Sequence, residues 1–373
     1  MLSAIAFFIP AVLPTLPTPN TGLVVEPCST PDVLSSSQIE ILTSRGFTKC
    51  CFGAFNVLVT GTSDYPDSYI LTAAVTVANI LDQDGDGVAD DPAVLAELSF
   101  AQNANPPKLH GAPTQETERE GDFTGNGFVY SFSLQTWHYN DCESNANAMT
   151  WGGYDCQTFV RRVITEEVFH MVTQIGYSRA HPAALGMTDF TSSIACREMA
   201  AAECVYWHHP ENECPNPGTH TPPPLEPATG TDGCNDAGCD CVEWIHQTVF
   251  ILANQTPGLY GGGLQPTTRD ALLPTLSSDF TEMLDDPAYH QISAPLPYSY
   301  SPAALPTIEA SIHRGTSIST GMLVLILALA GIGLIMLILW LGGVFPCCPS
   351  PFCPKQKQAA SSKDVTLEIP NAA

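Results

Sequence analysis

Basic residues are scarce in this sequence. Its 373 residues include 13 Lys and Arg against 38 Asp and Glu, and the formal net charge is -25. A surface of this sign repels phosphate backbones, so the charge excludes nucleic acid as a partner and favours cations, calcium above all. Apolar residues are not scarce: a hydrophobic fraction of 44% excludes a wholly disordered chain and suffices for a sizeable core.

Charge is missing altogether from residues 321–344, a run of 24 residues. About 20 apolar residues cross a bilayer as a helix, so this run predicts a transmembrane helix with some tilt. Lys355, Lys357 and Lys363 follow the run, whereas only Arg314 lies shortly before it. The positive-inside rule therefore places the C-terminus in the cytoplasm.

The chain begins with an apolar run that no Lys or Arg precedes. Its length is that of a signal-peptide core and too short for a second span, so residues 1–19 are predicted to be a signal peptide. An ectodomain over 20–286, a Pro- and Ser-rich stalk over 287–320 and a cytoplasmic tail over 345–373 follow. This organisation predicts a type I protein with a single span of the plasma membrane or a secretory-pathway membrane, its N-terminus extracellular or lumenal.

Fourteen cysteines and 32 prolines indicate an oxidising compartment and a loop-rich exterior. Eleven cysteines precede the predicted span, so five disulfides would leave one thiol free or paired between chains. Three cysteines follow the span, Cys347, Cys348 and Cys353. Two alternatives remain for them, S-palmitoylation and unmodified thiols. The N-x-[ST] sequon at Asn254 predicts a glycoprotein if that residue lies on the surface.

Apolar residues at helical spacing predict helices over 68–81, 91–102, 156–176, 192–208 and 241–254. Residues 37–60 combine a short helical pattern with an apolar run that suits a strand. The polar, Gly-rich residues 103–128 predict a loop. One mostly helical, disulfide-tied domain follows from these patterns.

The stretch DQDGDGVADD places carboxylates at alternate positions, Asp82, Asp84 and Asp86. Side chains at positions one, three and five of a tight loop converge on a hard cation. Gly87 at position six allows the sharp turn, and the carbonyl of Val88 at position seven adds an oxygen. The stretch resembles the calcium loops of the EF-hand and of thrombospondin type 3 repeats, and the resemblance implies a calcium site.

The bidentate glutamate of the EF-hand is missing, because Ala93 occupies position twelve of the loop at residues 82–93. Calcium binding is then weaker, or Asp90, Asp91 or Glu97 completes the site. The alternative is an acidic, solvated turn that caps the following helix.

A second motif lacks a histidine. Residues 163–177 read VITEEVFHMVTQIGY, and the core EEVFH resembles the HExxH helix of zincin metallopeptidases with its first His replaced by Glu. Residues four apart share a helix face, so Glu166 and His170 can both ligate one zinc ion. The resemblance gives Glu167 the position of the general base, which would polarise a metal-bound water.

This motif supplies two ligands, and a third is needed. The metzincin extension is absent, since Thr173 and Gly176 stand where its Gly and third His should be. Candidates are Glu198, Glu203 and Glu243. Glu243 is favoured because it begins an otherwise apolar helix, where a lone carboxylate is costly to bury.

The sequence contains two ExxH pairs, one ending at His170 and one formed by Glu243 and His246. Carboxylate-bridged di-metal bundles use two such pairs with two further glutamates, and Glu97 and Glu198 are available. That bundle needs four long helices, whereas Gly, Pro and Cys interrupt this chain. In the simplest alternative the motif binds no metal. Glu166 and Glu167 are then exposed, and His170 is a core histidine whose hydrogen bonds are made within the protein.

Together these features predict a mainly α fold: a disulfide-bonded, mostly helical ectodomain with a zincin-like or helix-loop-helix calcium element, plus one C-terminal transmembrane helix. The predicted function is a calcium-binding type I membrane protein with a degenerate zincin-like, metal-dependent hydrolase ectodomain, and the predicted cofactors are calcium and zinc. Two alternatives stay open, a non-enzymatic calcium-stabilised adhesion or matrix protein and a carboxylate-bridged di-metal protein. An extracellular protein or peptide is the expected partner.

Overall fold

A computed structural model of the chain describes residue 16, residues 18–19, and residues 22–136, 155–187, 193–203, 237–255 and 268–301, the side chains of 201–203 and 237–240 excepted. All of them belong to the first of two compact units, residues 1–311. The predicted transmembrane helix over 321–344 and the predicted tail lie outside the described residues. No helix in the described part of the chain is long and apolar enough to cross a membrane.

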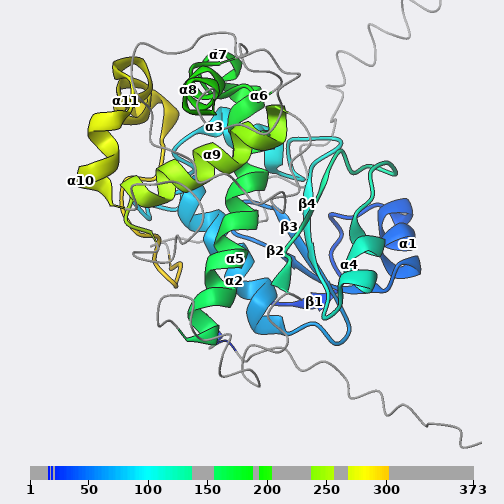
Figure 1. The fold of residues 1–373 in the computed structure, drawn as a ribbon. Helices are drawn as coiled ribbons and strands as arrows, with labels where there is room; N and C mark the ends of the chain where they lie inside the picture. The colour runs from blue at the N-terminus through cyan, green and yellow to red at the C-terminus, as the bar shows by residue number, and fades with distance from the viewer. Residues whose placement is uncertain are drawn as a thin grey trace, which may run out of the picture. The chain divides into compact units, whose positions relative to one another are not determined.

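One mixed sheet runs through the described residues (Figure 1). Its strands are β1 (Glu26–Pro27), β2 (Phe47–Phe52), β3 (Leu58–Thr62), β4 (Lys108–Gly111) and β5 (Ser131–Ser133). Their order across the sheet follows their order in the chain. β1, β2 and β3 are antiparallel neighbours, whereas β4 runs parallel to β3 and β5 parallel to β4.

Helices pack on both faces of this sheet (Figure 1). On one face α2 (Asp67–Leu81) packs on β2 and β3, and α5 (Cys156–Met171) packs on α2 and β5. On the other face α1 (Ser36–Ser44) packs on β2, and α4 (Gln115–Gly121) packs on β4 and β5. The other described helices are α3 (Pro92–Leu98), η3 (Val172–Tyr177), α6 (Ser178–Ala180), α7 (Pro182–Leu185), α8 (Ile194–Glu203), α9 (Ala237–Leu252), α10 (Arg269–Leu272), η4 (Leu273–Thr275), α11 (Ser278–Asp285) and η5 (Pro287–Tyr289).

The predicted mainly α fold is wrong, because a mixed sheet lies between helices on its two faces. Both faces of the sheet are buried, so its strands lack the alternation of polar and apolar residues that marks a half-exposed strand. In β2, Cys50 packs into the core beside α1, whereas Cys51 packs into the core beside α2. Leu58 and Val59 of β3 divide between the two cores in the same way.

The predicted loop at residues 103–128 contains β4 and α4. β4 reads as polar because it includes Lys108 and His110, yet both side chains are fully buried. The ammonium of Lys108 donates a hydrogen bond to the carbonyl of Gly121 at 2.6 Å and a second to Ser131 Oγ, and it lies 3.9 Å from the ring centroid of Phe123. Burial lowers the pKa of Lys108 to about 7.

Substituting Lys108 is expected to give a stability difference that depends on pH. Lys108 loses its proton near pH 7 in the folded chain, but only near pH 10.4 in the unfolded chain. Between these values the unfolded state binds more protons, so the wild type gains stability relative to Lys108→Met by about 1.4 kcal/mol per pH unit. Urea unfolding of both chains at several pH values from about 7 to 10 measures this gain. Lys49→Met, at a partly exposed lysine, is the control. A stability difference between the wild type and Lys108→Met that does not change with pH would contradict a neutral buried amine.

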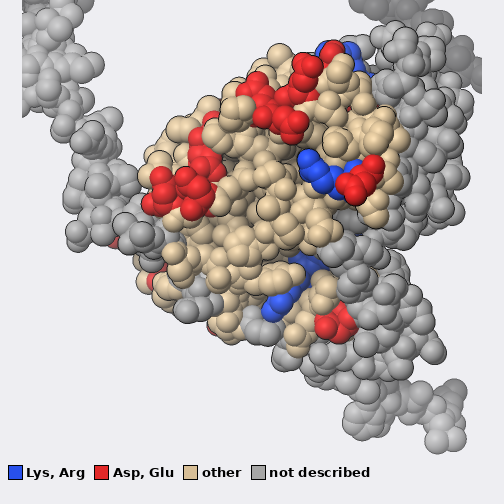
Figure 2. Space-filling model, turned by 90° about the vertical axis from the view of Figure 1, so that its left-hand side faces the viewer, with Lys and Arg blue, Asp and Glu red and all other residues tan. Residues whose placement is uncertain are grey.

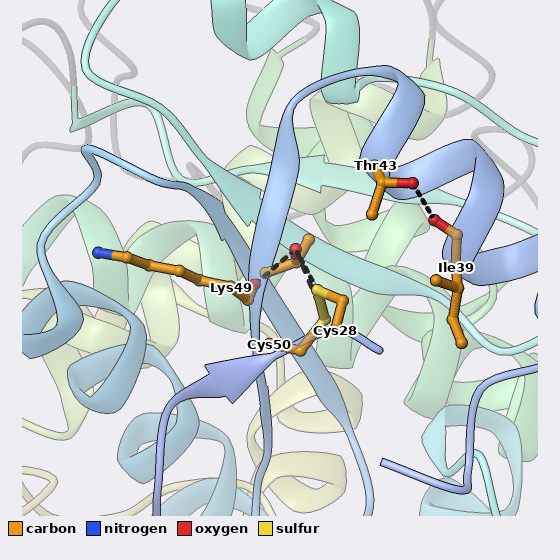
Figure 3. The surroundings of a disulfide bond; sticks show 6 residues. Cys28, Ile39, Thr43, Lys49 and Cys50 are labelled. Atoms are coloured by element: carbon orange, nitrogen blue, oxygen red, sulfur yellow. Dashed lines mark hydrogen bonds between the residues drawn. A yellow bond between two sulfur atoms is a disulfide. The ribbon is translucent and has the colours of Figure 1, made fainter. Parts of the chain in front are cut away.

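A disulfide between Cys28 and Cys50 joins the residue after β1 to β2 (Figure 3). Beside it, Thr60 donates a hydrogen bond from Oγ1 to the carbonyl of Lys49 at 2.9 Å. The neighbouring Cys51 is a free thiol, and its burial raises its pKa to about 12. The prediction of disulfide bonds is confirmed here and, below, at a second pair.

Candidate metal centre

Two helices place four potential metal ligands side by side. α5 contributes Glu166 and His170, one helical turn apart, and α9 contributes Glu243 and His246. One ligand atom from each of the four lies within 4.8 Å of the other three. The predicted set of Glu166, His170 and Glu243 therefore comes together in space, and His246 of the second ExxH pair joins it. These four residues are called the α5–α9 cluster below.

Each histidine of the α5–α9 cluster faces a carboxylate of the other helix. Nε2 of His170 lies 3.5 Å from Oε2 of Glu243. Nδ1 of His246 lies 3.5 Å from Oε1 of Glu166 and 3.7 Å from Oε2 of Glu243. The imidazole rings meet edge to face with their centroids 4.9 Å apart. These N···O separations exceed ordinary hydrogen-bond lengths, and Nε2 of His170 makes no hydrogen bond with the described residues.

Apolar packing and a disulfide hold the two helices at this separation. Phe169 of α5 meets Phe250 of α9 with ring centroids 5.2 Å apart. Trp244, next to Glu243, is buried against Phe280 of α11. A disulfide from Cys196 in α8 to Cys241 fixes α9 two residues before its first ligand. The glutamates and histidines of the cluster therefore stand on helices that the core positions.

The cluster extends from the core toward solvent. The side chain of His246 is fully buried and that of His170 is 9% exposed. The carboxylates are more accessible, with 17% of Glu166 and 31% of Glu243 exposed. An ion between them would have imidazoles on its buried side and carboxylates on its solvent side.

Glu167 lies on the opposite side of the His170 ring. Its Oε2 is 3.6 Å from Nδ1 of His170, whereas Nε2 of that ring faces Glu243. Burial raises the pKa of Glu167 to about 7. A carboxylate beside Nδ1 favours the tautomer with its proton there, which directs the Nε2 lone pair into the cluster. The exposed glutamates that the structural alternative requires are not observed, because Glu166 and Glu167 are both largely buried.

Charge within the cluster is distributed unequally. Burial acts to lower the pKa of His170, but Glu243 and Glu167 outweigh it and hold that pKa well above its ordinary value. Burial acts to raise the pKa of Glu243, but His170 and His246 hold it well below its ordinary value. Burial keeps the pKa of His246 below its ordinary value. Glu243 and His246 are thus in the forms that bind a metal, an ionised carboxylate and a neutral imidazole, whereas His170 has to release a proton to bind one.

Two other glutamates considered as ligands are engaged elsewhere. Glu97 lies 3.7 Å from Nη1 of Arg179. Glu198 accepts hydrogen bonds from the backbone N–H of Ser277, at 2.8 Å, and from its hydroxyl. The side chain of Glu203 lies outside the described residues. The two additional carboxylates that a di-metal bundle requires are thus not in the α5–α9 cluster.

Arg162 and His181 were not among the predicted site residues. Arg162 lies with Nη1 3.3 Å from Oε2 of Glu166, four residues along α5. This spacing is the usual helical ion-pair spacing and is a signal that could have identified it. His181 pairs with Asp91 at 2.5 Å across 90 residues, and no local pattern in the sequence indicates such a contact.

The acidic loop also brings three predicted ligands together. One carboxylate oxygen from each of Asp82, Asp84 and Asp86 lies within 4.8 Å of the others. Oδ1 of Asp82 accepts hydrogen bonds from the N–H groups of Gly85 and Asp86, and Oδ2 accepts one from Gly87. Both glycines have positive φ, +72° and +88°, which glycine adopts without strain. The backbone therefore wraps around the first carboxylate of the loop.

Three other predicted calcium ligands have different surroundings. A carboxylate oxygen of Asp90 accepts a hydrogen bond from the N–H of Gln83 at 2.7 Å. Asp91 caps the N-terminus of α3 and pairs with His181, so both of its oxygens have partners. Val88 has an exposed side chain, and its N–H donates to Asp86. Asp82, Asp84 and Asp86 thus remain the compact part of the predicted site.

Residues 287–301, which the sequence assigns to the stalk, lie against this loop. The hydroxyl of Tyr300 donates a hydrogen bond to Oδ2 of Asp82 at 2.6 Å, and its side chain is 3% exposed. Asn79, in the last turn of α2, donates to the carbonyl of Pro297 at 2.8 Å. The Pro-rich composition of this segment predicts a stalk, so the sequence pattern did not indicate these contacts.

Calcium is expected to raise the melting temperature through this loop. The N–H of Asp86 lowers the pKa of Asp84, but burial and the carboxylates of Asp82, Asp86 and Asp90 outweigh it and raise that pKa, and a cation would relieve this repulsion. At a tenfold excess over a Kd of about 10⁻³ M, stabilisation is about 1.4 kcal/mol, or about 3–6 °C.

Differential scanning calorimetry with and without calcium measures the shift. Asp84→Ala with Asp86→Ala is expected to remove it, whereas Asp32→Ala with Glu40→Ala, an exposed pair of equal charge, is expected to keep it. An unchanged shift in the first variant would place the calcium elsewhere.

The chain matches no known protein-family model, no curated protein sequence and no solved structure.

Proposed function

We propose that this protein is a metal-dependent hydrolase with a single zinc ion held between α5 and α9. The observation that carries the proposal is the convergence of Glu166, His170, Glu243 and His246, whose ligand atoms lie within 4.8 Å of one another. The four come from two segments more than 70 residues apart, so their meeting is a property of the fold and not of local sequence.

The chemistry of the donors fits zinc. Two imidazoles and two carboxylates are ligands that zinc binds, whereas calcium prefers oxygen ligands alone. The Nε2 atom of His170 is buried, makes no hydrogen bond with the described residues and lies 3.5 Å from Oε2 of Glu243, a separation that suits two ligands of one ion. Glu97 and Glu198 lie outside the cluster, which favours one ion over two.

The residues of such a site have different roles. His170 and His246 anchor the buried side, and Glu166 or Glu243 completes the ligand set from the solvent side, where the exposed fraction of Glu243 leaves room for a substrate. Zinc supplies a Lewis acid that polarises a substrate carbonyl and activates water. Glu167 lies beside Nδ1 of His170 and would orient that ring, whereas the resemblance to zincins implies the role of general base for it. A peptide is the proposed substrate.

Metal analysis tests this proposal. The full-length chain, purified without chelator, is expected to contain close to one equivalent of zinc. Removing the metal with phenanthroline should stop hydrolysis of a mixed peptide library, and added zinc should restore it. A folded chain with neither zinc nor any other transition metal would contradict the proposal.

A second function stays open because the acidic loop is folded around Asp82. In that alternative the protein is a non-enzymatic, calcium-stabilised adhesion or matrix protein, and calcium stabilises it without any catalysed reaction. Its disulfides favour an extracellular or lumenal ectodomain. The exposed Asn254 at the end of α9 is accessible for glycosylation.

A further inference from the structure

An arginine lies beside one potential ligand of the α5–α9 cluster. Arg162 precedes Glu166 by four residues on α5, and its Nη1 lies 3.3 Å from Oε2 of Glu166. The other carboxylate oxygen, Oε1, lies 3.5 Å from Nδ1 of His246 on α9. The two oxygens of Glu166 therefore have different neighbours, a cation beside one and the rest of the cluster beside the other.

Cations are uncommon beside the carboxylates of this chain. Lys and Arg number 13 against 38 Asp and Glu, and Figure 2 shows acidic side chains gathered in patches with few basic ones among them. The pair of Arg162 and Glu166 is also shielded from solvent, with 15% and 17% of the side chains exposed. In three other pairs each side chain is at least 27% exposed, namely Arg45–Glu120, Lys49–Asp67 and Arg179–Glu97. Water and salt weaken an exposed pair, so the shielded pair fixes its carboxylate more firmly.

The number of oxygens that Glu166 offers decides how a zinc site at the cluster is filled. A carboxylate binds a metal through one oxygen or through two, and zinc takes four ligands, or five when a water or substrate is added. One atom from each of the four cluster residues fills four positions. If Glu166 bound through both oxygens, the protein would fill five positions and leave none for water. A cation beside Oε2 keeps that oxygen away from the ion.

We propose that Arg162 is a positioning residue of the zinc site. Its guanidinium holds Oε2 of Glu166, so that Glu166 presents only Oε1 beside His246 and a position stays open for water. Arg162 contacts neither the ion nor the substrate and acts through Glu166. This role rests on the proposed function, because it requires an ion in the α5–α9 cluster.

The zinc affinity of the full-length chain tests this role, measured by competition with a chromophoric chelator at about 150 mM salt. Arg162→Met is expected to weaken zinc binding about 10- to 100-fold, the usual cost of losing a residue that orients a ligand. Arg162→Lys should restore part of this loss, since lysine keeps the charge but lacks the planar fork of donors. Arg162→Gln replaces the methionine variant if that variant does not fold, and the same loss is expected.

A double-mutant cycle separates a positioning role from a structural one. In a Glu166→Gln chain, Arg162→Met should cause no further loss of zinc affinity, because Arg162 then has no carboxylate to hold. A residue that only stabilises α5 would cause the same loss in both backgrounds. The urea midpoint of each variant, which reports its stability, is measured on the same preparations.

Arg161→Met is the matched control. Arg161 is the preceding residue of α5, and its Cζ lies 4.4 Å from the ring centroid of Tyr298, so this variant removes the same charge from a different contact. Its zinc affinity should stay within about twofold of the wild type, since only a screened long-range repulsion is lost. Unchanged zinc affinity in Arg162→Met, or equal losses with Glu166 and with Gln at that position, would overturn the positioning role.

The outcomes for this role and for the hydrolase are distinguishable. Zinc binding that depends on Arg162, in a chain that hydrolyses no peptide, would contradict the hydrolase alone. Hydrolysis with a zinc affinity independent of Arg162 would contradict the positioning role alone. A folded chain that binds no transition metal would overturn both.

Discussion

Replacing His170 or His246 with Ala is expected to abolish zinc binding, with metal content falling from about one equivalent to a background level. Each residue supplies one of two imidazoles on the buried side of the cluster, and carboxylates alone bind zinc far more weakly. Metal analysis after gel filtration, with circular dichroism to check the fold, measures the loss. Equal damage by the two variants also follows from the di-metal alternative, but that alternative requires two equivalents in the wild type.

Both histidines are buried, so an alanine variant that fails to fold would be uninformative. Glu243→Gln provides the second measurement, because 31% of that side chain is exposed and the amide has nearly the same shape. It is expected to weaken zinc binding by at least about tenfold, since an ionised ligand becomes neutral. His181→Ala and Glu198→Gln are controls that alter a histidine and a glutamate outside the cluster, and zinc content should stay at one equivalent in both. A cluster that holds no metal would leave zinc content unchanged in every folded variant.

Glu167→Gln is expected to lower the rate of hydrolysis by about 10² to 10⁴ while zinc remains bound, if Glu167 acts as the general base. The amide keeps the size of the side chain and leaves an acceptor oxygen near Nδ1 of His170, so the ligands stay in place. Zinc content and kcat, measured on the same preparation, test this expectation.

The position of Glu167 beside Nδ1 of His170 defines the contrasting outcome. If the carboxylate only orients the imidazole, zinc affinity falls by about 10- to 100-fold and excess zinc restores the rate. Arg162→Met is the matched variant for the other glutamate, because it removes the charge beside Glu166 and leaves Glu167 unchanged. A full rate at full zinc content in Glu167→Gln would exclude both roles.

The sequence predicts the local part of each candidate site. Four-residue spacing on a helix puts Glu166 and His170 on one face, and three-residue spacing does the same for Glu243 and His246. Alternate aspartates before a glycine bring Asp82, Asp84 and Asp86 together through the turn itself. These predictions need only the fixed geometry of a helical turn or a tight loop.

The sheet was not predictable in the same way. β1 to β5 are at most six residues long and are covered on both faces, so no period-two pattern distinguishes them from short pieces of helix or loop. Lys108 and His110 made β4 look exposed, although both are fully buried and each makes a hydrogen bond with Ser131 Oγ. Burial of polar residues depends on partners that come from distant segments, and their spacing along the chain does not reveal them.

The sequence by itself determined the strong negative charge, the helical ExxH pairs and the turn of the acidic loop, since composition and short-range geometry suffice for each. Only the tertiary structure decided that α9 meets α5, that Glu97 and Glu198 pair elsewhere, and that Tyr300 reaches Asp82. These contacts join residues from about 70 to 220 positions apart. Which distant segments meet is settled by the packing of whole apolar faces and by disulfides such as Cys196–Cys241, and no local pattern encodes that choice.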